Sequence, residues 1–361
     1  MSGAERDSTP EVLSGDLLLA SCPTPVRGRN QIVLGHGSGG KLSAELIETM
    51  FLPAFNNEVL ARMDDQAVLE IGGTRLAFTT DAFVVTPIFF PGGDIGRLAI
   101  HGTVNDLAMS GARPLYLSAT FILEEGLPMD DLARVVESMR VASIESGVML
   151  VTGDTKVVDR GKADKLFITT TGIGIIEDDV RISASAASPG DVIILSGTIG
   201  DHGMAVLSQR ENLTFEGEIA SDTAPLHGLV ASMIAASHDI HCLRDPTRGG
   251  VATTLNELAA KSGVGMLLDE ETIPVNENVR GACEILGLDP LYVANEGKLV
   301  AIVAAEASDR ILLAMKQHPL GRESRVIGRV VSAHPGMVLM NTGIGGTRVV
   351  DVMFGEQLPR I

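Results

Sequence analysis

At 361 residues the chain is long for one domain, and two domains of ordinary size are expected. A net charge of −18 and an aromatic content of 3% without tryptophan argue against a nucleic-acid surface, although Mg²⁺ and backbone amides could still hold a nucleotide locally. No apolar run reaches the roughly 20 residues of a membrane helix, and the acidic start is unlike a secretory signal. Cys22, Cys242 and Cys283 form neither a metal-ligand spacing nor an even disulfide set, and such cysteine usage favours the reducing cytoplasm.

Residues 1–30 are polar and contain proline, so we expect a flexible arm there. A glycine-rich loop follows and feeds a helix predicted over residues 42–51; the loop residues of interest are Gly37, Ser38, Gly39, Gly40 and Lys41. Backbone amides of such loops approach phosphate closely, and a helix N-terminus favours negative charge. The spacing is not that of a P-loop, so a flexible lead into the helix is the alternative.

The densest polar pattern comes after the first predicted strands. An apolar run ends on Asp81, a Pro-Gly-Gly turn follows, and a helix is predicted between Asp94 as its N-cap and Gly111 as its stop. Asn105 and Asp106 lie inside that helix among small and apolar residues. A strand-end Asp and a helix-borne Asn-Asp pair can converge on one cation, and such oxygen ligands suit Mg²⁺.

Two further carboxylates stand at the boundaries of predicted strands. Asp65 precedes an apolar alternation. Taken alone, such an aspartate is typical of a solvated turn; a role in a site is favoured only because Asp81 and Asp106 occur as well. Residues 148–158 are interpreted as a buried strand that breaks at Gly153 and places Asp154 and Lys156 at its end. A carboxylate and an amine there are unlike a simple turn, so a site role is predicted for Asp154 or Lys156.

The second half begins at a seam near residues 183–191. The predicted division is therefore residues 31–182, residues 183–334, and closing strands with a tail at residues 335–361. Strands pair with neighbouring strands and long helices intervene singly, which predicts an α/β (α+β) chain of two sheets covered by helices. The pattern fits neither a TIM barrel nor a dinucleotide-binding fold.

Two polar residues of the second half have alternative interpretations. Arg248 lies in a tight turn before a predicted helix, where it either clamps an anion or pairs with Asp245. Glu296 lies at a loop–strand junction, where it is either a site carboxylate or the salt-bridge partner of Lys298.

Together these motifs resemble the hydrogenase maturation factor HypE family, within the wider group of aminoimidazole-ribonucleotide synthetases, selenophosphate synthetases and thiamin-monophosphate kinases. The resemblance runs from about residue 31 to residue 361. Its motifs are HGSGG at 36–40, the Pro-Gly-Gly turn, TVNDL at 103–107, SGARP at 110–114, GDTKVV at 153–158, DPTRGG at 245–250 and NEGKL at 295–299. The NDL run is shared across the wider group, whereas the motifs GDTKVV, NEGKL and the terminal PRI have a much narrower distribution and point to the HypE family in particular.

The resemblance implies an aminoimidazole-ribonucleotide-synthetase-like fold, an ATP-binding and dimerisation domain at residues 31–182, and a homodimer with nucleotide at the subunit interface. It also implies an ATP-dependent dehydration. A carbamoyltransferase, HypF, carbamoylates the thiol of a C-terminal cysteine; the carboxamide oxygen is phosphorylated, and loss of phosphate leaves a thiocyanate. The cyano group then reaches the iron of the [NiFe] hydrogenase centre through a HypC–HypD complex.

Carried over motif by motif, the resemblance also implies residue roles. The implied Mg²⁺ ligands are Asp65, Asp81, Asp106 and Asp154. The implied ATP contacts are Gly37, Ser38, Gly39, Gly40, Lys41, Asp81, Asn105, Asp154 and Arg248. The implied proton-transfer residues are Lys156 and Glu296.

The chain departs from the family pattern at its end. The family's tail ends Pro-Arg-Ile-Cys, whereas this sequence ends at Pro359-Arg360-Ile361. Either a terminal residue is missing from the sequence, or the chain cannot carry the group on itself; Cys242 and Cys283 lie inside predicted folded elements and are poor substitutes. Two other functions stay open: a kinase or synthetase acting on a free small molecule, and a non-catalytic scaffold for hydrogenase maturation.

Overall fold

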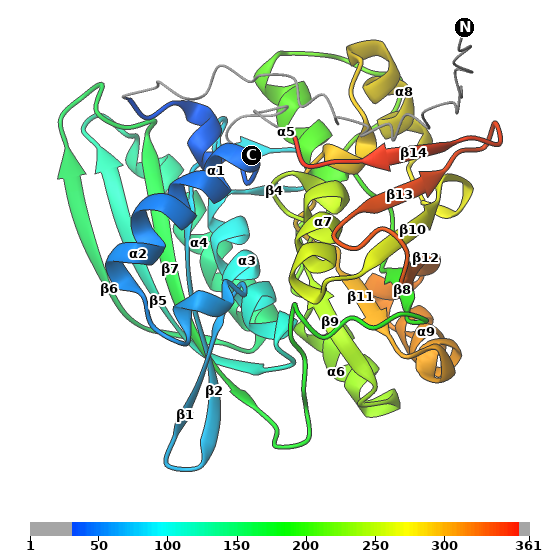
Figure 1. The fold of residues 1–361 in the computed structure, drawn as a ribbon. Helices are drawn as coiled ribbons and strands as arrows, with labels where there is room; N and C mark the ends of the chain where they lie inside the picture. Colours follow the sequence, from blue (N-terminus) through cyan, green and yellow to red (C-terminus); the bar gives the residue numbers. More distant parts are fainter. Residues whose placement is uncertain (1–30, 354–361) are drawn as a thin grey trace, which may run out of the picture. The chain divides into compact units, whose positions relative to one another are not determined.

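The computed structural model describes residues 31–353 of the chain. The arm predicted at residues 1–30 and the Pro359-Arg360-Ile361 tail therefore lie outside the described residues. Within residues 31–353 the chain forms two main sheets whose faces are covered by helices (Figure 1). The prediction of an α/β (α+β) chain with two sheet-and-helix domains is confirmed.

The first sheet has five strands within the described residues, in the order β1-β2-β7-β5-β6. All neighbours are antiparallel except the parallel pair β5–β6. The strands are β1 (Ala67–Ile71), β2 (Thr74–Phe83), β5 (Arg113–Glu124), β6 (Met149–Val158) and β7 (Leu166–Ile176). Two helices, α3 (Ile95–Met109) and α4 (Met129–Ser146), bury apolar side chains against the sheet.

Short elements precede this sheet and connect it to α3. The chain starts with η1 (Leu34–Gly37), α1 (Lys41–Leu46), η2 (Ile47–Phe51), α2 (Leu52–Phe55) and η3 (Leu60–Arg62). The helix predicted over residues 42–51 is thus α1 continued by the wider turn η2. A two-stranded ribbon, β3 (Phe89–Phe90) and β4 (Gly93–Asp94), leads into α3.

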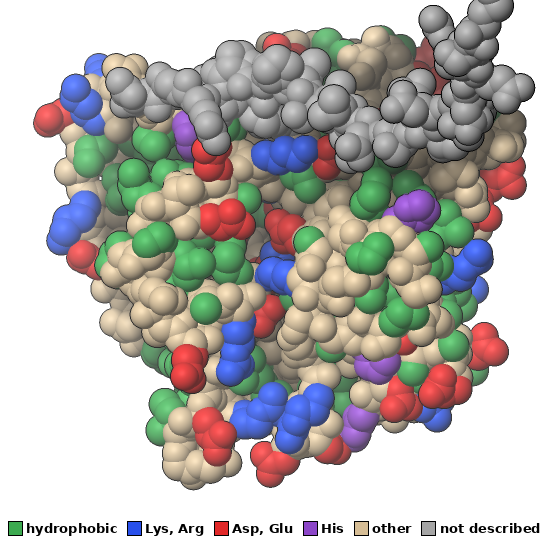
Figure 2. Space-filling model, viewed as in Figure 1, with side chains coloured by type: hydrophobic (Ala, Val, Ile, Leu, Met, Phe, Trp, Pro, Cys, Tyr) green, Lys and Arg blue, Asp and Glu red, His purple; other side chains and the backbone are tan. Residues whose placement is uncertain are grey.

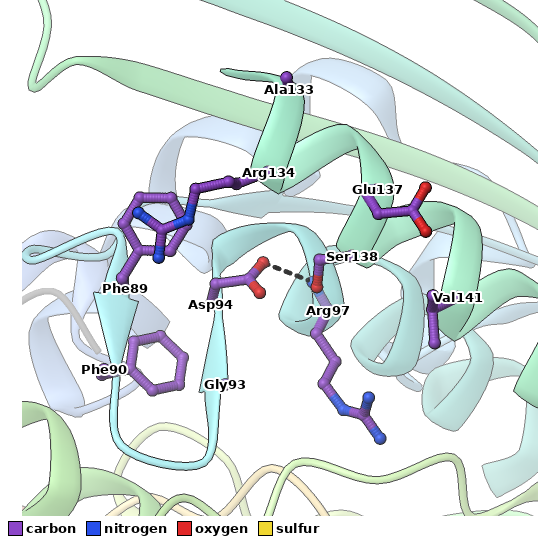
Figure 3. A pocket seen from close by; sticks show the side chains of 10 residues that line it. All are labelled: Phe89, Phe90, Gly93, Asp94, Arg97, Ala133, Arg134, Glu137, Ser138 and Val141. Atoms are coloured by element: carbon purple, nitrogen blue, oxygen red, sulfur yellow. Dashed lines mark hydrogen bonds between the residues drawn. The ribbon is translucent and has the colours of Figure 1, made fainter. Parts of the chain in front are cut away.

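Helix α3 is buried along almost its whole length and contributes to the cores of both domains. The Asp94 carboxylate accepts two amide hydrogen bonds of the first turn, at 2.7 and 3.1 Å, and Figure 3 shows it pointing at the start of the helix. Gly111 follows the helix with φ +75°, which favours glycine. The predicted start and stop are confirmed. Most of α3 packs in the apolar core of the first domain, whereas Ala108 and Met109 pack against apolar residues of the second domain. Helix α3 therefore carries side chains to the junction of the domains.

The second sheet has seven strands within the described residues, in the order β14-β13-β10-β12-β8-β11-β9. These are β8 (Val192–Leu195), β9 (Ile240–Arg244), β10 (Gly265–Asp269), β11 (Val300–Val303), β12 (Arg325–Val331), β13 (Val338–Asn341) and β14 (Thr347–Val350). Helix α7 (Gly250–Ser262) packs on one face, and α6 (His227–Ala236) and α9 (Ser308–Gln317) pack on the other. Because β13 and β14 pair within this sheet, the closing strands continue the second domain.

The remaining elements surround the second sheet. Helices α5 (Asp201–Arg210) and α8 (Glu277–Leu286) share a smaller apolar cluster. The short turns are η4 (Glu270–Thr272), η5 (Pro290–Tyr292), η6 (Ala305–Ala307) and η7 (Pro319–Gly321). None of the helices described between residues 31 and 353 has the length and apolar character needed to cross a membrane.

Strand β6 differs from the expected buried strand that breaks at Gly153. It runs unbroken through that residue, and every side chain of it is exposed except Val158, which is half-buried. The reason is its position, since β6 is the edge strand of the first sheet. A Cβ at residue 153 would overlap the Ala119 carbonyl oxygen, so Gly153 permits close strand pairing and does not mark a break.

Candidate functional site

Five carboxyl groups from separate parts of the chain come together where α3 meets the second domain; we call them the carboxylate cluster. Asp65 precedes β1, Asp81 lies near the end of β2 and Asp106 lies on α3, whereas Asp245 follows β9 and Glu296 precedes β11. Besides burial, the charges of Asp65, Asp81 and Asp245 raise the pKa of Asp106, and those of Asp81 and Asp245 raise the pKa of Glu296, so the five groups lie within electrostatic reach of one another. Figure 2 shows acidic and basic side chains gathered down the middle of this face.

Burial raises the pKa of every carboxyl group in this cluster, and repulsion between several of them adds to the rise. Burial raises the pKa of Asp106 well above its ordinary value, and Asp245, Asp81 and Asp65 add to the rise. A hydrogen bond from the Thr79 hydroxyl, at 2.9 Å, opposes it. Burial, followed by Asp65, raises the pKa of Asp245 to about 7. Such a group of carboxyls would gain stability from a bound cation.

Two arginines supply part of the opposing charge. Arg244 Nε lies 2.8 Å from Asp65 Oδ2, and its Nη2 lies 2.8 Å from Glu257 Oε2. Arg248 lowers the pKa of both Asp81 and Glu296 by its charge. Within the described residues Arg248 makes no ion pair with Asp245, so the purely structural pairing is not what the structure shows.

The glycine loop lies directly against Arg248. The Nη1 of Arg248 donates to the Gly37 carbonyl at 2.9 Å. A Cβ on Gly39 (φ +77°) would lie 3.0 Å from Arg248 Cβ, so glycine permits this approach. Ser38 Oγ donates to the Gly35 carbonyl at 2.9 Å, and Lys41 Nζ pairs with Asp351 Oδ2 at 2.8 Å. The loop and the carboxylate cluster therefore share Arg248 as a neighbour.

Asn105 is placed at the domain junction with its side chain fully engaged. It is 1% exposed. Its Nδ2 donates to the carbonyls of Ala224 at 3.1 Å and Glu296 at 3.2 Å, and its Oδ1 accepts from the Leu226 amide at 2.8 Å. A direct nucleotide contact of Asn105 stays a prediction, whereas its tie to the backbone of Glu296 is observed.

Asp154 and Lys156 are not brought to the cluster within one chain. Their side chains pair with each other at 3.0 Å on β6 and are 59% and 70% exposed. Asp154 is in register with Thr120, Thr120 with Thr169, and Thr169 with Ala82. Three strand spacings, about 14 Å, therefore separate Asp154 from the backbone beside Asp81.

Glu296 is not the partner of Lys298. Lys298 Nζ instead pairs with Asp222 Oδ2 at 3.0 Å. Glu296 is 8% exposed. Burial raises the pKa of Glu296 well above its ordinary value, with Asp245, Asp81 and Asp222 adding to the rise. The salt-bridge interpretation of Glu296 is thus wrong.

Sequence reasoning did not propose Asp245, Arg244 or Asp222 as members of the site. Asp245 follows directly after β9, much as Asp81 ends the apolar run of β2, so a strand-end carboxylate was an available signal. Arg244 is the last residue of β9, and its role depends on Asp65 being nearby, which the sequence does not reveal. Asp222 lies in an irregular segment without a motif.

The donor set fits Mg²⁺ shared with a substrate. Between residues 31 and 353, no three His, Cys, Asp or Glu side chains form a ready-made metal site. Mg²⁺ is usually held by one or two carboxylates together with substrate phosphates and water, so a complete protein cage is not required. Burial raises the pKa of Asp81 and Asp106, and a bound cation would favour the ionised carboxylates that serve as ligands.

Comparisons with known proteins identify both domains. Residues 63–176 match the model of the AIR synthase related protein N-terminal domain, and residues 188–339 match the C-terminal domain of that family. A carbamoyl dehydratase HypE of Cupriavidus necator is 59% identical over 332 residues, covering 92% of this chain and 95% of the relative.

Solved structures agree with this assignment. A HypE–HypF complex contains a chain that is 49% identical, with a TM-score of 0.82, covering 85% of this chain and 99% of that one. HypE in complex with ATP is 51% identical, with a TM-score of 0.77, covering 91% and 99%. The predicted family and the prediction of an enzyme are confirmed. The chain therefore belongs to the carbamoyl dehydratase HypE family of hydrogenase maturation proteins, built on two AIR synthase related domains.

Proposed function

We propose that this chain uses ATP to dehydrate a carboxamide carried on a C-terminal cysteine thiol, which forms the thiocyanate that supplies the cyano ligand of the [NiFe] hydrogenase centre. The observation that carries the proposal is the meeting of a glycine loop, Arg248 and the carboxylate cluster at the domain junction. The ATP complex of a relative 51% identical to this chain supports ATP as the phosphoryl donor.

The phosphates of ATP would lie between the loop and the cluster. The backbone amides of Gly37, Ser38, Gly39 and Gly40 and the amine of Lys41 would donate to the phosphates. Arg248 would contribute a guanidinium to the same anion. Because Lys41 is exposed and its Asp351 partner is exposed too, little energy is needed to separate that ion pair.

Mg²⁺ would be held by Asp81 and Asp106 together with the ATP phosphates. Asp65 is already paired with Arg244 at 2.8 Å. It could therefore orient the other carboxylates of the cluster or bind Mg²⁺ itself. When bound, Mg²⁺ would neutralise the negative charge that develops on the phosphates during phosphoryl transfer. Asp154 would complete the set only if a second subunit delivers it.

The reaction balances in two steps. The carboxamide oxygen attacks the γ-phosphorus of ATP, ADP leaves and one amide proton is lost, which gives an O-phosphorylated imidate. The remaining N–H proton is then removed, the C–O bond breaks and inorganic phosphate leaves, so that a C≡N triple bond forms on the sulfur. Phosphorylation is needed because an unmodified oxygen is a poor leaving group.

Glu296 is suited to accept a proton in this sequence. Its burial raises its pKa, which makes its ionised form a stronger base, and the positive charge of Arg248 favours that ionised form. Lys156 is the second residue of this step. As it lies on the exposed edge strand β6, we propose that it acts in the site of the other subunit of a homodimer.

The exposed edge of β6 is compatible with such a dimer. It carries exposed Met149, Leu150, Val151 and Val157, with 58%, 41%, 58% and 67% of their surfaces accessible. An edge strand with free backbone groups and apolar side chains is a ready surface for a second chain. HypF, as the carbamoyl donor, and a HypC–HypD complex, as the acceptor, are the further partners that we propose, in the cytoplasm.

Mass spectrometry of the chain tests this function. A chain extended by a cysteine after Ile361 would be incubated with HypF, a carbamoyl donor, ATP and Mg²⁺. Dehydration removes water from the carbamoylated chain, so a mass loss of about 18 Da that requires ATP is expected. The unextended chain is the matched control. A carbamoylated chain that hydrolyses ATP without losing this mass would contradict the proposal.

A further inference from the structure

The connection between α5 and α6 contains a segment, residues 220–226, that lies against both domains. The Ser221 amide donates to the Pro91 carbonyl at 2.8 Å, and Ser221 Oγ lies 2.8 Å from His202 Nδ1. Gly92 lies so close that a Cβ on it would be 2.7 Å from the Ser221 backbone. The segment is thus fixed against the Pro-Gly-Gly turn of the first domain and helix α5 of the second.

Asp222 joins this segment to residues 296–298, which lie just before β11. Its Oδ1 accepts a hydrogen bond from the Glu296 amide at 3.0 Å, and its Oδ2 pairs with Lys298 Nζ at 3.0 Å. Asp222 and Lys298 side chains are 4% and 14% exposed. A carboxylate this deeply buried is retained only with its partners in place.

The peptide of Glu296 is therefore held from two sides. Asp222 holds its amide, and Asn105 of α3 holds its carbonyl at 3.2 Å. Gly297 allows the close approach, because a Cβ there would overlap the Asp222 carbonyl oxygen. Asn105 also holds the 220–226 segment at Ala224 and Leu226, so the contacts form one closed set.

We propose that Asp222 is a positioning residue for Glu296: it fixes the Glu296 peptide so that the carboxyl group points at the reacting carboxamide. This inference rests on the proposed function, in which Glu296 accepts a proton. Lys298 acts one step further away, since its Nζ pairs with the second oxygen of Asp222 and fixes it. Neither residue contacts substrate in this scheme.

The test separates the hydrogen bond from the buried charge. Removing Asp222 alone would leave Lys298 buried and unpaired, so both variants also carry Lys298→Met. Asp222→Asn/Lys298→Met keeps an oxygen that accepts from the Glu296 amide, whereas Asp222→Ala/Lys298→Met does not. Both variants and the otherwise unchanged chain, all extended by a cysteine after Ile361, are compared for dehydration and for hydrogen exchange at the Glu296 amide.

We expect the Ala variant to lose about 10- to 100-fold in kcat for dehydration, with the KM for ATP unchanged, because a misdirected base slows only the step that it serves. The Asn variant should recover most of that loss, and the Glu296 amide should exchange faster in the Ala variant alone. Equal kcat in the two variants would overturn the proposal, as would parallel losses in kcat and folded fraction. If the extended chain with Asp222 and Lys298 intact forms no thiocyanate, the proposed function fails, and equal exchange of the Glu296 amide in both variants would still refute the positioning role.

Discussion

The carboxylate cluster and the Asp154–Lys156 pair contain the same kinds of side chain in opposite environments. In the cluster, burial raises the pKa of Asp106, and neighbouring carboxylates raise it further. On β6, a hydrogen bond from Lys156 lowers the pKa of Asp154, followed by one from the Thr155 amide. One aspartate therefore tends to keep its proton while the other is readily ionised.

The difference shows what each region lacks. Ionising all five carboxyls of the cluster would leave more negative charge than Arg244 and Arg248 balance, which is why we propose that it binds a cation together with a phosphate-bearing ligand. The β6 pair is balanced in charge but exposed on an edge strand, which is why we propose that a second protein surface covers it. We propose that a single reaction uses both, which makes the comparison open to experiment.

The largest effect is expected for Asp106→Asn, which removes a proposed ligand from the cluster. ATP turnover should fall by about 1,000-fold, because an amide balances the charge of the metal and phosphates poorly. Turnover is measured as released phosphate at saturating Mg²⁺ and ATP. Asp130→Asn, an exposed aspartate of α4, is the matched control. An Asp106→Asn chain with unchanged turnover would remove Asp106 from the metal site.

The next effect is expected for Lys156→Ala, which changes the edge pair and leaves the cluster intact. In chains extended by a cysteine after Ile361, thiocyanate formation should fall by about 100-fold, as for the loss of a proton-transfer group, while ATP binding stays near normal. Lys316→Ala, an exposed lysine of α9, serves as the control. Full-rate thiocyanate formation by the Lys156→Ala chain would contradict the assignment.

Mixing two inactive chains tests whether the regions meet across subunits. If Lys156 serves the Glu296 of the other subunit, a mixed dimer of Lys156→Ala and Glu296→Gln chains, both extended by a cysteine after Ile361, has one intact site. About half of the dimers in an equal mixture are mixed, so about a quarter of the wild-type rate should return. If no activity returns although mixed dimers form, then Lys156 and Glu296 do not act across the dimer.

The comparison also explains what could be predicted from sequence. Asp81, Asp94 and Gly111 were identified because their chemistry belongs to local patterns, namely a strand end, a cap and a left-handed stop. The exposure of β6 could not be predicted, since an apolar run is the same whether the strand lies inside the sheet or at its edge. Asp222 was not identified because its contact with Glu296 joins positions 74 residues apart, which no local sequence pattern reveals.

The smallest effect concerns protonation of the cluster without ligands. The folded-state pKa of Asp245 is raised from 3.8 to about 7, so the folded chain holds this proton more tightly than the unfolded chain does. The stability from this group is therefore complete below about pH 4 and is lost as the pH rises through about 7. Asn at position 245 cannot ionise, so the loss should disappear in Asp245→Asn.

Thermal unfolding in EDTA, without nucleotide, measures this difference. At pH 4 the wild type and Asp245→Asn should melt close together, and the variant should gain in stability relative to the wild type between pH 4 and pH 7, so that it melts several degrees higher at pH 8. Asp130→Asn should follow the wild type at both values. Added Mg²⁺ and ATP should close the gap at pH 8, because bound cations favour the ionised carboxylates. A variant that is less stable than the wild type at pH 8 would show that Asp245 already has a favourable partner when ionised, and the cluster would then need no cation at that position.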